Sequence, residues 1–476
     1  MWSAGRGLIA VVVFLLALES RAAVADHEQA DTIPLVKIGR IIIAGNAVTR
    51  DRIVLRELSL ATGDTLSRSR LDEVLTANRN RLYNLRLFNR VSLEPLELSP
   101  GIIDLLVEVQ ERWYTYPVPL FELSDRNFND WWQNYRHDLS RVNYGLRLFQ
   151  YNFRGRNETL RLTARFGFSR RFDLYYHIPN LTRDQKHGLL FEMEYAEPSN
   201  LAYRTEDHVL TFLRERKPLR KSNGISVTYS FRKTFYQTHH LELSWDGYRV
   251  SDTIRSLNPE YLSGGRSAQH ASTIGYRFVS EHRDVIAYPL HGIHFSAGVQ
   301  RTGLVSTDQV RQTNFWYHFA THHEPAKDLY LSLFSSVSAT LPSDQPYALY
   351  NGIGYRKQFL RGYEIYVIEG PVYTLNKATL KKRILHRDYV LQGAPMEQMR
   401  YVPLSVYLKT YADLGYVENY PGYKAAGIND RLSGKVLAGA GIGLDIVTYY
   451  DSVIRFEYSV TSQKTSGFFF HVRKEF

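Results

Sequence analysis

Residues 404–415 run Leu-Ser-Val-Tyr-Leu-Lys-Thr-Tyr-Ala-Asp-Leu-Gly. Side chains along a β-strand point alternately to its two faces, so the even positions of this segment form one mostly apolar face. The odd positions form a second face, which carries Tyr407, Lys409, Tyr411 and Asp413. A helix would not separate the two sets in this way, because its period is 3.6 residues. The segment is therefore predicted to be a strand with an apolar side and a polar side.

The same alternation recurs from residue 113 to the C-terminus, interrupted at short intervals by Gly, Pro, Asn or Asp. In the last segment, residues 468–476, the even positions are mostly apolar and the odd positions mostly charged. A soluble sandwich would bury such apolar faces in a core, whereas a transmembrane barrel turns them to lipid and the polar faces to a wet lumen. The barrel is favoured, because the predicted strands follow one another over a long region and their apolar faces are only moderately apolar.

Composition narrows the class of protein. Only 44% of the 476 residues are hydrophobic, and no run of about 20 apolar residues occurs, which excludes a polytopic helical membrane protein. The absence of cysteine excludes disulfides, thiolate metal sites and cysteine nucleophiles. Tyrosines outnumber phenylalanines, 34 to 24, as suits surfaces that are half apolar and half wet. The net charge of +11 is spread singly and fits anionic lipid or acidic clients better than nucleic acid.

The N-terminus has the pattern of an export signal. Arg6 precedes a short apolar run over residues 8–18, and Ala23-Val24-Ala25 forms a small-residue cleavage site. The apolar run is too short for a helix that spans a bilayer. Residues 1–25 are therefore predicted to be a signal peptide and are left out of the fold prediction.

Residues 36–112 have a different pattern from the rest. An apolar strand opens this segment, and two stretches of helical spacing follow, for which Thr49 and Ser67 are the expected N-caps. Two strands then close it, over residues 91–98 and 102–109. The order β-α-α-β-β predicts one small α/β domain. The remaining region, 113–476, has room for about sixteen strands at roughly 45 residues per hairpin, and the last strand is expected to pair with the first to close the barrel.

Residues 36–112 resemble a POTRA domain, and the remainder resembles the sixteen-stranded barrel of the BamA/TamA-like outer-membrane assembly and translocation superfamily, also called the bacterial surface antigen barrel. The POTRA resemblance rests on Ile41-Ile42-Ile43-Ala44-Gly45-Asn46, Leu85-Arg86-Leu87-Phe88 and Val107-Glu108-Val109. The barrel resemblance rests on Leu360-Arg361-Gly362-Tyr363, on Arg283-Asp284 with Pro289 and Gly292, on Gly441 with Gly443-Leu444-Asp445, and on the terminal Phe476.

The resemblance implies an all-β transmembrane barrel in a bacterial outer membrane, preceded by a POTRA domain in the periplasm. It also implies that the loop Leu360-Arg361-Gly362-Tyr363 folds into the barrel lumen, where Arg361 binds an acidic residue of the inner wall. Asp413 is the candidate partner, because it belongs to the polar face of its strand. The family often supplies a second acid from the strand after the loop, but that strand here carries Lys377, Lys381 and Arg383.

The last strand is expected to carry a recognition signal for the protein's own insertion, made by Phe468, Phe470, Val472 and Phe476. Gly441 and Gly443 are expected to face inward, where small residues let a neighbour pack closely or the strand bend. The pairs His239-His240 and His322-His323 are expected in short turns and give no metal site, because adjacent strand residues point to opposite faces.

The sequence favours a protein that inserts, assembles or translocates polypeptides at the outer membrane without nucleotide hydrolysis. Expected partners are unfolded outer-membrane or secreted polypeptides, periplasmic chaperones or accessory lipoproteins, and outer-membrane lipid and lipopolysaccharide; nucleic acid is not expected. A dedicated transporter of one secreted protein or lipid is the alternative, and an outer-membrane enzyme or a passive porin ranks lower. No G-x-S-x-G, Walker or H-E-x-x-H motif occurs, so neither a catalytic site nor a cofactor is expected.

Overall fold

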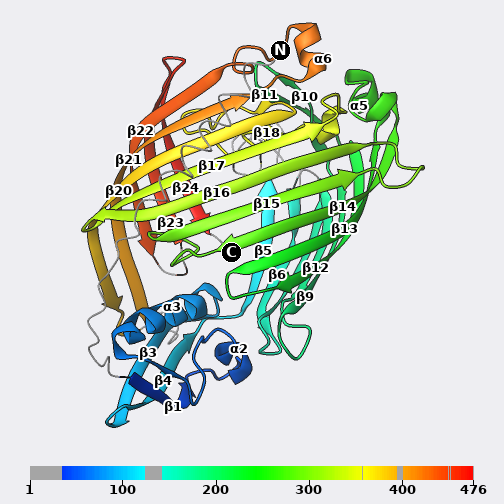
Figure 1. Ribbon diagram of the computed structural model, residues 1–476. Coiled ribbons are helices and arrows are strands. Elements are labelled where there is room, and N and C mark those ends of the chain that lie inside the picture. Colours follow the sequence, from blue (N-terminus) through cyan, green and yellow to red (C-terminus); the bar gives the residue numbers. More distant parts are fainter. Residues whose placement is uncertain are drawn as a thin grey trace.

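The computed structural model describes residues 35–123, 142–355, 358–393, 400–448, 450 and 452–474. A small N-terminal domain lies at one end of a large curved sheet (Figure 1). The predicted signal segment and Phe476 fall outside the described residues. Within the described ranges, no helix combines the length and the apolar character that crossing a membrane requires.

The N-terminal domain packs two helices against a four-stranded sheet. Its elements are β1 (Leu35–Ala44), α2 (Asp51–Leu55), β2 (Thr65–Ser67), α3 (Leu71–Asn84), β3 (Phe88–Ser99) and β4 (Ile102–Glu111). The sheet order is β2-β1-β4-β3, with β1 and β4 parallel and β2 and β3 at the edges. Ile53, Leu82 and Phe88 are fully buried between helices and sheet. The fold agrees with the predicted order, with the short strand β2 added.

Both predicted helix caps are wrong. Helix α2 has Arg50 at its N-cap without a side-chain bond, because the Thr49 hydroxyl donates instead to Glu111, over 2.6 Å. The Ser67 hydroxyl bonds to that of Ser69, and a single 3-10 turn precedes α3. Long-range and neighbouring polar groups outcompete the local backbone for these two hydroxyls.

The large sheet contains sixteen strands, each antiparallel to its neighbours, which confirms the predicted fold class. The strands in chain order are β5 (Thr115–Leu123), β6 (Val142–Phe153), β7 (Glu158–Gly167), β8 (Arg170–Ile178), β9 (His187–Glu197), β12 (Arg220–Arg232), β13 (Gln237–Val250), β14 (Ala268–Glu281), β15 (Gly292–Thr302), β16 (Gln312–Ala326), β17 (Leu329–Leu341), β20 (Val372–Val390), β21 (Tyr401–Val417), β22 (Val436–Thr448), β23 (Ser452–Thr461) and β24 (Ser466–Lys474). Neighbours in the chain are neighbours in the sheet throughout.

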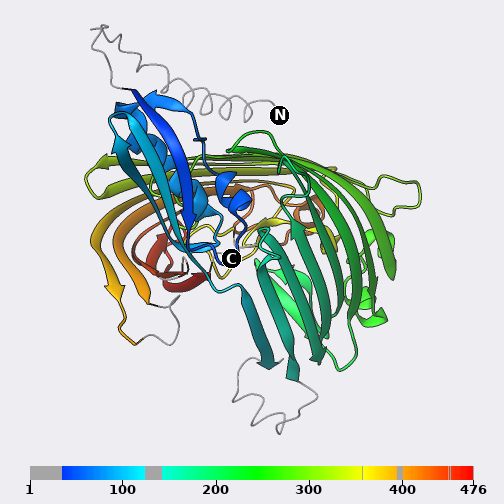
Figure 2. The same ribbon diagram turned by 90° about the horizontal axis from the view of Figure 1, so that it is seen from below.

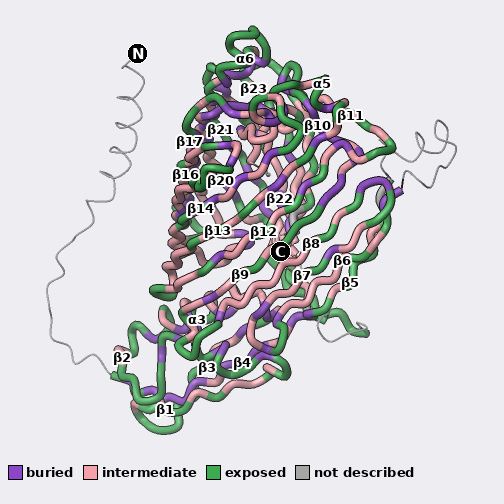
Figure 3. The backbone as a smooth tube through the Cα atoms, turned by 90° about the vertical axis from the view of Figure 1, so that its right-hand side faces the viewer, coloured by how far each residue is buried: buried purple, intermediate pink, exposed green. Residues whose placement is uncertain are grey.

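The two faces of the sheet differ as the alternation predicts. On β21, Leu408 and Leu414 are each 52% exposed on the outer face, whereas Lys409 and Asp413 are buried on the inner face. Exposed and buried residues alternate along the strands in the same way elsewhere in the sheet (Figure 3). The apolar outer face and the polar inner face are those of a lipid-facing barrel wall.

Loop elements cover the end of the sheet that lies away from the N-terminal domain, here called the distal end (Figure 1). They are the hairpin of β10 (Asn200–Glu206) and β11 (Val209–Arg214), the helices α5 (Asp252–Leu257) and α6 (Pro421–Ala426), and the strand pair β18 (Gly352–Ile353) and β19 (Ile368–Glu369). Tyr350 stacks on Tyr420 with ring centroids 3.8 Å apart, so loops distant in sequence are packed into one cover.

The sheet is open between its first and last strands. Strands β5 and β24 end the strand order, and no ladder joins them in the described part of the chain. Seen from the side of the N-terminal domain, the teal and red ends of the sheet stand apart (Figure 2). The expected pairing of the last strand with the first is therefore wrong. Pro117 and Pro119 lie on β5, in keeping with an edge strand, because proline lacks the N–H that a ladder needs.

The N-terminal domain is docked against turns at its end of the sheet. The Arg232 guanidinium donates to both carboxylate oxygens of Glu57, over 2.6 and 2.7 Å, and Glu57 is 2% exposed. The Asn84 side chain donates to the Asp284 carbonyl, over 2.9 Å, and accepts from the Ile286 N–H, over 3.0 Å. These bonds position helix α3 directly beside the turn between β14 and β15.

Candidate functional site

The loop between β17 and β20 carries the predicted arginine motif and binds the inner wall. The Arg361 Nε donates to Oδ2 of Asp413 over 2.8 Å, the Arg361 backbone N–H donates to the same oxygen over 3.1 Å, and Nη2 donates to Oδ1. The Arg361 side chain is 12% exposed and that of Asp413 is 0% exposed. The structure thus brings these two predicted residues together as a two-pronged ion pair, the geometry in which arginine binds carboxylates most strongly.

Further contacts hold the guanidinium of Arg361. Nη2 donates to the Thr379 hydroxyl over 3.0 Å, and the guanidinium carbon lies 3.9 Å from the ring centroid of Tyr411. The second acid is Glu457 of β23, with Oε1 3.9 Å from Nη1. Strand β20, which follows the loop, supplies a hydroxyl and a carbonyl instead of a carboxylate. The second acid therefore comes from β23 and not from the strand after the loop, whose Lys377, Lys381 and Arg383 already indicated a different arrangement.

The other residues of the motif anchor the loop. Leu360 and Tyr363 are 0% and 2% exposed in an apolar cluster, and the Tyr363 hydroxyl lies 3.0 Å from that of Ser462. Gly439 of β22 lies beneath the loop, because a Cβ atom there would be 2.0 Å from the Arg361 carbonyl oxygen. Gly439 was not predicted from the sequence, although its alternation with Gly441 and Gly443 places it on the same face of the strand.

The two predicted glycines face inward and lie beneath large side chains. A Cβ atom on Gly441 would be 2.6 Å from the Tyr411 hydroxyl, and one on Gly443 would be 2.8 Å from Cε of Lys409. The absence of side chains at these positions lets Tyr411 and Lys409 of the neighbouring strand lie flat along the wall. The glycines therefore give room to the residues that surround Arg361.

A second group of charges, centred on Asp445, adjoins the first. The Asp445 carboxylate accepts from Lys409 over 2.6 Å, from Arg455 over 3.1 Å and from the Tyr288 hydroxyl over 2.9 Å. Lys409 also lies 2.8 Å from Oε1 of Glu457, which links this group to Arg361. None of these contacts was predicted from the sequence. We call the inner-wall residues Asp413, Lys409, Asp445, Arg455 and Glu457, together with Arg361, the wall cluster.

Tyr288 reaches the wall cluster from the turn between β14 and β15. The same turn contains the predicted Arg-Asp, Pro and Gly positions. The Pro289 carbonyl accepts from Lys381 over 3.1 Å. Gly292 has a φ of 100°, and a Cβ atom there would be 2.1 Å from the His282 carbonyl oxygen. This turn also binds Asn84 of the N-terminal domain, so it connects that domain to the wall cluster.

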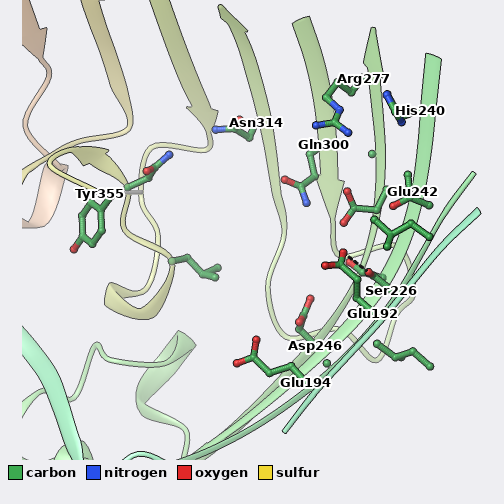
Figure 4. Close-up of a pocket in the computed structure, with 18 of the residues that line it drawn as sticks. Glu192, Glu194, Ser226, His240, Glu242, Asp246, Arg277, Gln300, Asn314 and Tyr355 are labelled. Atoms are coloured by element: carbon green, nitrogen blue, oxygen red, sulfur yellow. Dashed lines mark hydrogen bonds between the residues drawn. The ribbon is translucent and has the colours of Figure 1, made fainter. Parts of the chain in front are cut away.

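A polar cavity of about 1230 Å³ lies along the opposite wall, on the inner face of β6 to β17. Glu192, Glu194, Glu242 and Asp246 project into the same space as Arg277 (Figure 4). The mixture of both signs of charge is that of a water-filled lumen. The sequence predicted a polar inner face but not this grouping, because its residues come from strands far apart in the chain.

Three of the residues predicted to form the signal in the last strand lie on the outer face. Phe468, Phe470 and Val472 are 66%, 55% and 58% exposed, and Phe470 packs on Phe456 with centroids 5.1 Å apart. The predicted turn location of the histidine pairs is wrong, because one pair lies within β13 and the other within β16. The alternation of these histidines with apolar neighbours would have predicted that they lie in strands.

Comparison with known proteins gives two family matches. The POTRA model, described as a surface antigen variable number repeat, matches residues 36–112, and the Omp85 superfamily domain matches residues 152–476. A protein of Treponema pallidum (strain Nichols), named "Putative outer membrane protein assembly factor", is 38% identical over 79 residues, which is 16% of this chain and 9% of that protein. The chain thus spans less than a tenth of that relative's length.

Solved structures similar to this chain include a BamA and a CdiB. BamA from Haemophilus ducreyi lacking POTRA domains 1–3 is 16% identical, with a TM-score of 0.51 over 92% of this chain and 83% of that one. CdiB from Escherichia coli is 11% identical, with a TM-score of 0.47 over 99% of each chain. The BamA likeness supports the fold.

Proposed function

Because the chain belongs to the Omp85 superfamily, we propose that it assembles, inserts or translocates polypeptide clients at the outer membrane. Members of this superfamily are generally non-enzymatic proteins of assembly and transport, and the POTRA domain lies in the periplasm. The end of the sheet next to that domain is therefore periplasmic, and the distal end is extracellular.

The open sheet is the observation that carries this proposal. Among the residues that the structure describes, β5 and β24 each present an edge without a ladder partner in the barrel wall. Backbone groups without partners in lipid cost several kcal/mol each, so these edges favour pairing with another strand. A client hairpin offers such a strand. Insertion would thus proceed by strand addition at the seam, driven by client folding without a nucleotide.

The POTRA domain would capture clients before they reach the seam. Its sheet has free edges at β2 and β3. On β3, Leu96 and Leu98 are 40% and 63% exposed. Extended peptides add to such edges through main-chain bonds, and apolar contacts strengthen the binding. Deleting residues 36–112 is expected to leave a barrel that inserts but does not support its clients.

A first experiment is depletion of the protein in cells, followed by a census of the outer-membrane proteins and lipids that are lost. A second uses the natural absence of cysteine. A cysteine in place of Val118 on β5 should form disulfides with cysteines in the end strands of clients, whereas a cysteine in place of Leu241, in the middle of the sheet, should form none. Equal crosslinking at both positions would contradict insertion at the seam.

The polar cavity favours a second candidate, a transporter that passes one secreted polypeptide through the lumen. Its charged lining, including Glu192 and Arg277, would remain solvated around an extended chain. In that case, depletion would remove one secreted protein and leave outer-membrane proteins unchanged. Crosslinks would then form from cysteines on the inner wall, such as one in place of Gln300, and not from position 118.

A further inference from the structure

Three potential metal ligands meet where the arginine loop touches the last two strands. They are Glu364 of the loop, Glu457 of β23 and His471 of β24. One carboxylate oxygen from each glutamate and one imidazole nitrogen lie within 4.8 Å of one another. The distance from Glu457 Oε2 to His471 Nε2 is 3.9 Å. No sequence motif reveals this group, because the three residues come from separate elements.

The two oxygens of Glu457 have different surroundings. Oε1 faces the cations of the wall cluster, 2.8 Å from Lys409 Nζ and 3.9 Å from Arg361 Nη1. Oε2 faces His471 instead. The Glu457 side chain is 3% exposed, so its carboxylate depends on nearby charges rather than on water. Lysine and arginine thus occupy one side of this carboxylate and leave the other side for a further ligand.

The two carboxylate oxygens of Glu364 differ in their hydrogen bonding. Its Oε2 accepts from the Gly362 N–H over 2.7 Å. Its Oε1 is buried and has no hydrogen-bond partner among the residues that the structure describes. A buried unsatisfied oxygen is costly, and more so beside a second carboxylate. A cation bound between the two glutamates would remove both penalties.

We propose that Glu364, Glu457 and His471 bind one Zn²⁺ ion. Carboxylate oxygens and a neutral imidazole nitrogen are ligands that Zn²⁺ accepts, and three protein ligands with a water in the fourth position make a common zinc site. Ca²⁺ takes six to eight oxygen ligands and Mg²⁺ prefers near-octahedral oxygen coordination, so both suit this set poorly. Ligand atoms around a tetrahedral Zn²⁺ lie about 3.4 Å apart, as follows from bonds of about 2.1 Å, so rotation of the half-buried Glu364 and His471 side chains would close the site.

The ion would fasten the arginine loop to β24. Within the described ranges, strand β24 has a ladder with β23 and none at its other edge. His471 also stacks on Phe359 of the loop, with centroids 6.3 Å apart. A metal bond between Glu364 and His471 would therefore restrain the strand at the seam. Neither the ion's binding nor this restraint depends on which client the protein handles.

The test is a Zn²⁺ titration of the full chain, folded in detergent micelles, by isothermal calorimetry. The wild type should bind one Zn²⁺ at least tenfold more tightly than Glu364→Gln or His471→Ala. His386→Ala is the matched control, because His386 is exposed on β20 away from the site, and it should bind like the wild type. Equal Zn²⁺ affinity in all four proteins would overturn the proposal.

Three further measurements separate zinc binding at this site from other causes. X-ray absorption of the zinc-loaded wild type should show one imidazole nitrogen with oxygen neighbours, and a shell of several imidazoles would overturn the assignment. Heat-modified gel mobility without metal should be the same in both variants and in the wild type, which establishes that the variants are folded. Titration with Ca²⁺ or Mg²⁺ should give at least tenfold weaker binding, and equal affinity would contradict a site selective for Zn²⁺.

Discussion

The Tyr288 hydroxyl donates to Oδ2 of Asp445 over 2.9 Å, although the two residues are 157 positions apart in the chain. Tyr288 belongs to a periplasmic turn and Asp445 to the inner wall of β22. The turn that holds Tyr288 also binds Asn84 of the POTRA domain. One short segment therefore contacts both the domain that would capture clients and the charges that surround the arginine loop.

Replacing Tyr288 with Phe should destabilise the barrel by about 1.5–3 kcal/mol, the range for a hydrogen bond to a charged group. Asp445 would lose one hydrogen bond but keep Lys409 and Arg455 as partners, so the loss is that of one hydrogen bond to a charged group whose other bonds remain. The measurement is the thermal transition of the detergent-folded protein. Tyr458→Phe, at an exposed position on the outer face, should leave the transition unchanged. Equal shifts in both variants would refute the role of the buried contact.

Replacing Arg361 with Ala should leave the barrel inserted but release the loop and reduce function. Removing one partner of a buried ion pair costs about 3–5 kcal/mol, because Asp413 would stay charged and unpaired. Arg361→Lys should rescue little, since an ammonium cannot make the two-pronged bond and the Tyr411 contact together. Protease sensitivity of the loop and client levels in cells report the two effects. Full activity with unchanged gel mobility would refute the prediction.

Replacing both Pro117 and Pro119 with Val should favour closure of the seam. The substitutions restore two backbone N–H donors to β5 and add residues that suit strands. Amide hydrogen exchange of β24 should slow, and client insertion should decline. Pro403→Val, on β21, is the control and should alter neither property. If β24 exchanges at the same rate in the double variant, the prolines do not keep the seam open.

Arginine at position 470 should impair insertion more than arginine at position 476. Phe470 is 55% exposed on the lipid-facing side, and arginine there costs about 2–4 kcal/mol at mid-membrane against about 0–1 near the interface. The measurement is the fraction of protein in outer-membrane pellets that resists protease. Equal insertion of both variants would place this strand outside the barrel wall.

Acid should loosen the extracellular cover through His208. Burial, followed by the charge of Arg431, lowers the pKa of His208 to about 4, despite the opposing charges of Asp207 and Asp430. Its Nε2 accepts the Leu432 N–H over 2.9 Å, which requires the neutral imidazole. Because the folded pKa lies below the ordinary value of about 6.5, the stabilisation is complete above pH 6.5 and is lost as the pH falls toward 4.

The expected loss is at most about 3 kcal/mol. Proteolysis of the hairpin of β10 and β11 should accelerate over that pH range in the wild type. His208→Gln, which does not titrate, should be cleaved at a rate that varies little with pH. The same acceleration in this variant would assign the effect to other groups.

Much of the arrangement of the barrel wall could be predicted from the sequence. Alternation along residues 404–415 separated the lipid face from the lumen face, which follows from the two-residue period of a strand, a local property. That Arg361 binds an acid of the inner wall was implied by the family resemblance, and the strand's alternation then selected Asp413 as the partner. The functional role of this pair stays a prediction.

The rest depends on contacts that have no local pattern. Asp445 joins Lys409, Arg455 and Tyr288 only because three strands and a turn converge on it. The Thr49 hydroxyl does not cap the predicted helix, because it donates to Glu111, 62 positions away in the chain. The open seam did have a local signal, since two prolines in the first strand are typical of a sheet edge.

The open seam also affects the diameter of the barrel. In a closed barrel, the number of strands and their stagger fix the diameter, so the wall cannot widen without breaking a ladder. This sheet meets no such closure condition, because β5 and β24 are separate. Its perimeter can grow by about 4.8 Å for each strand added, while all fifteen existing ladders remain intact. The wall can therefore enlarge in steps of one strand and return to its first size when those strands leave.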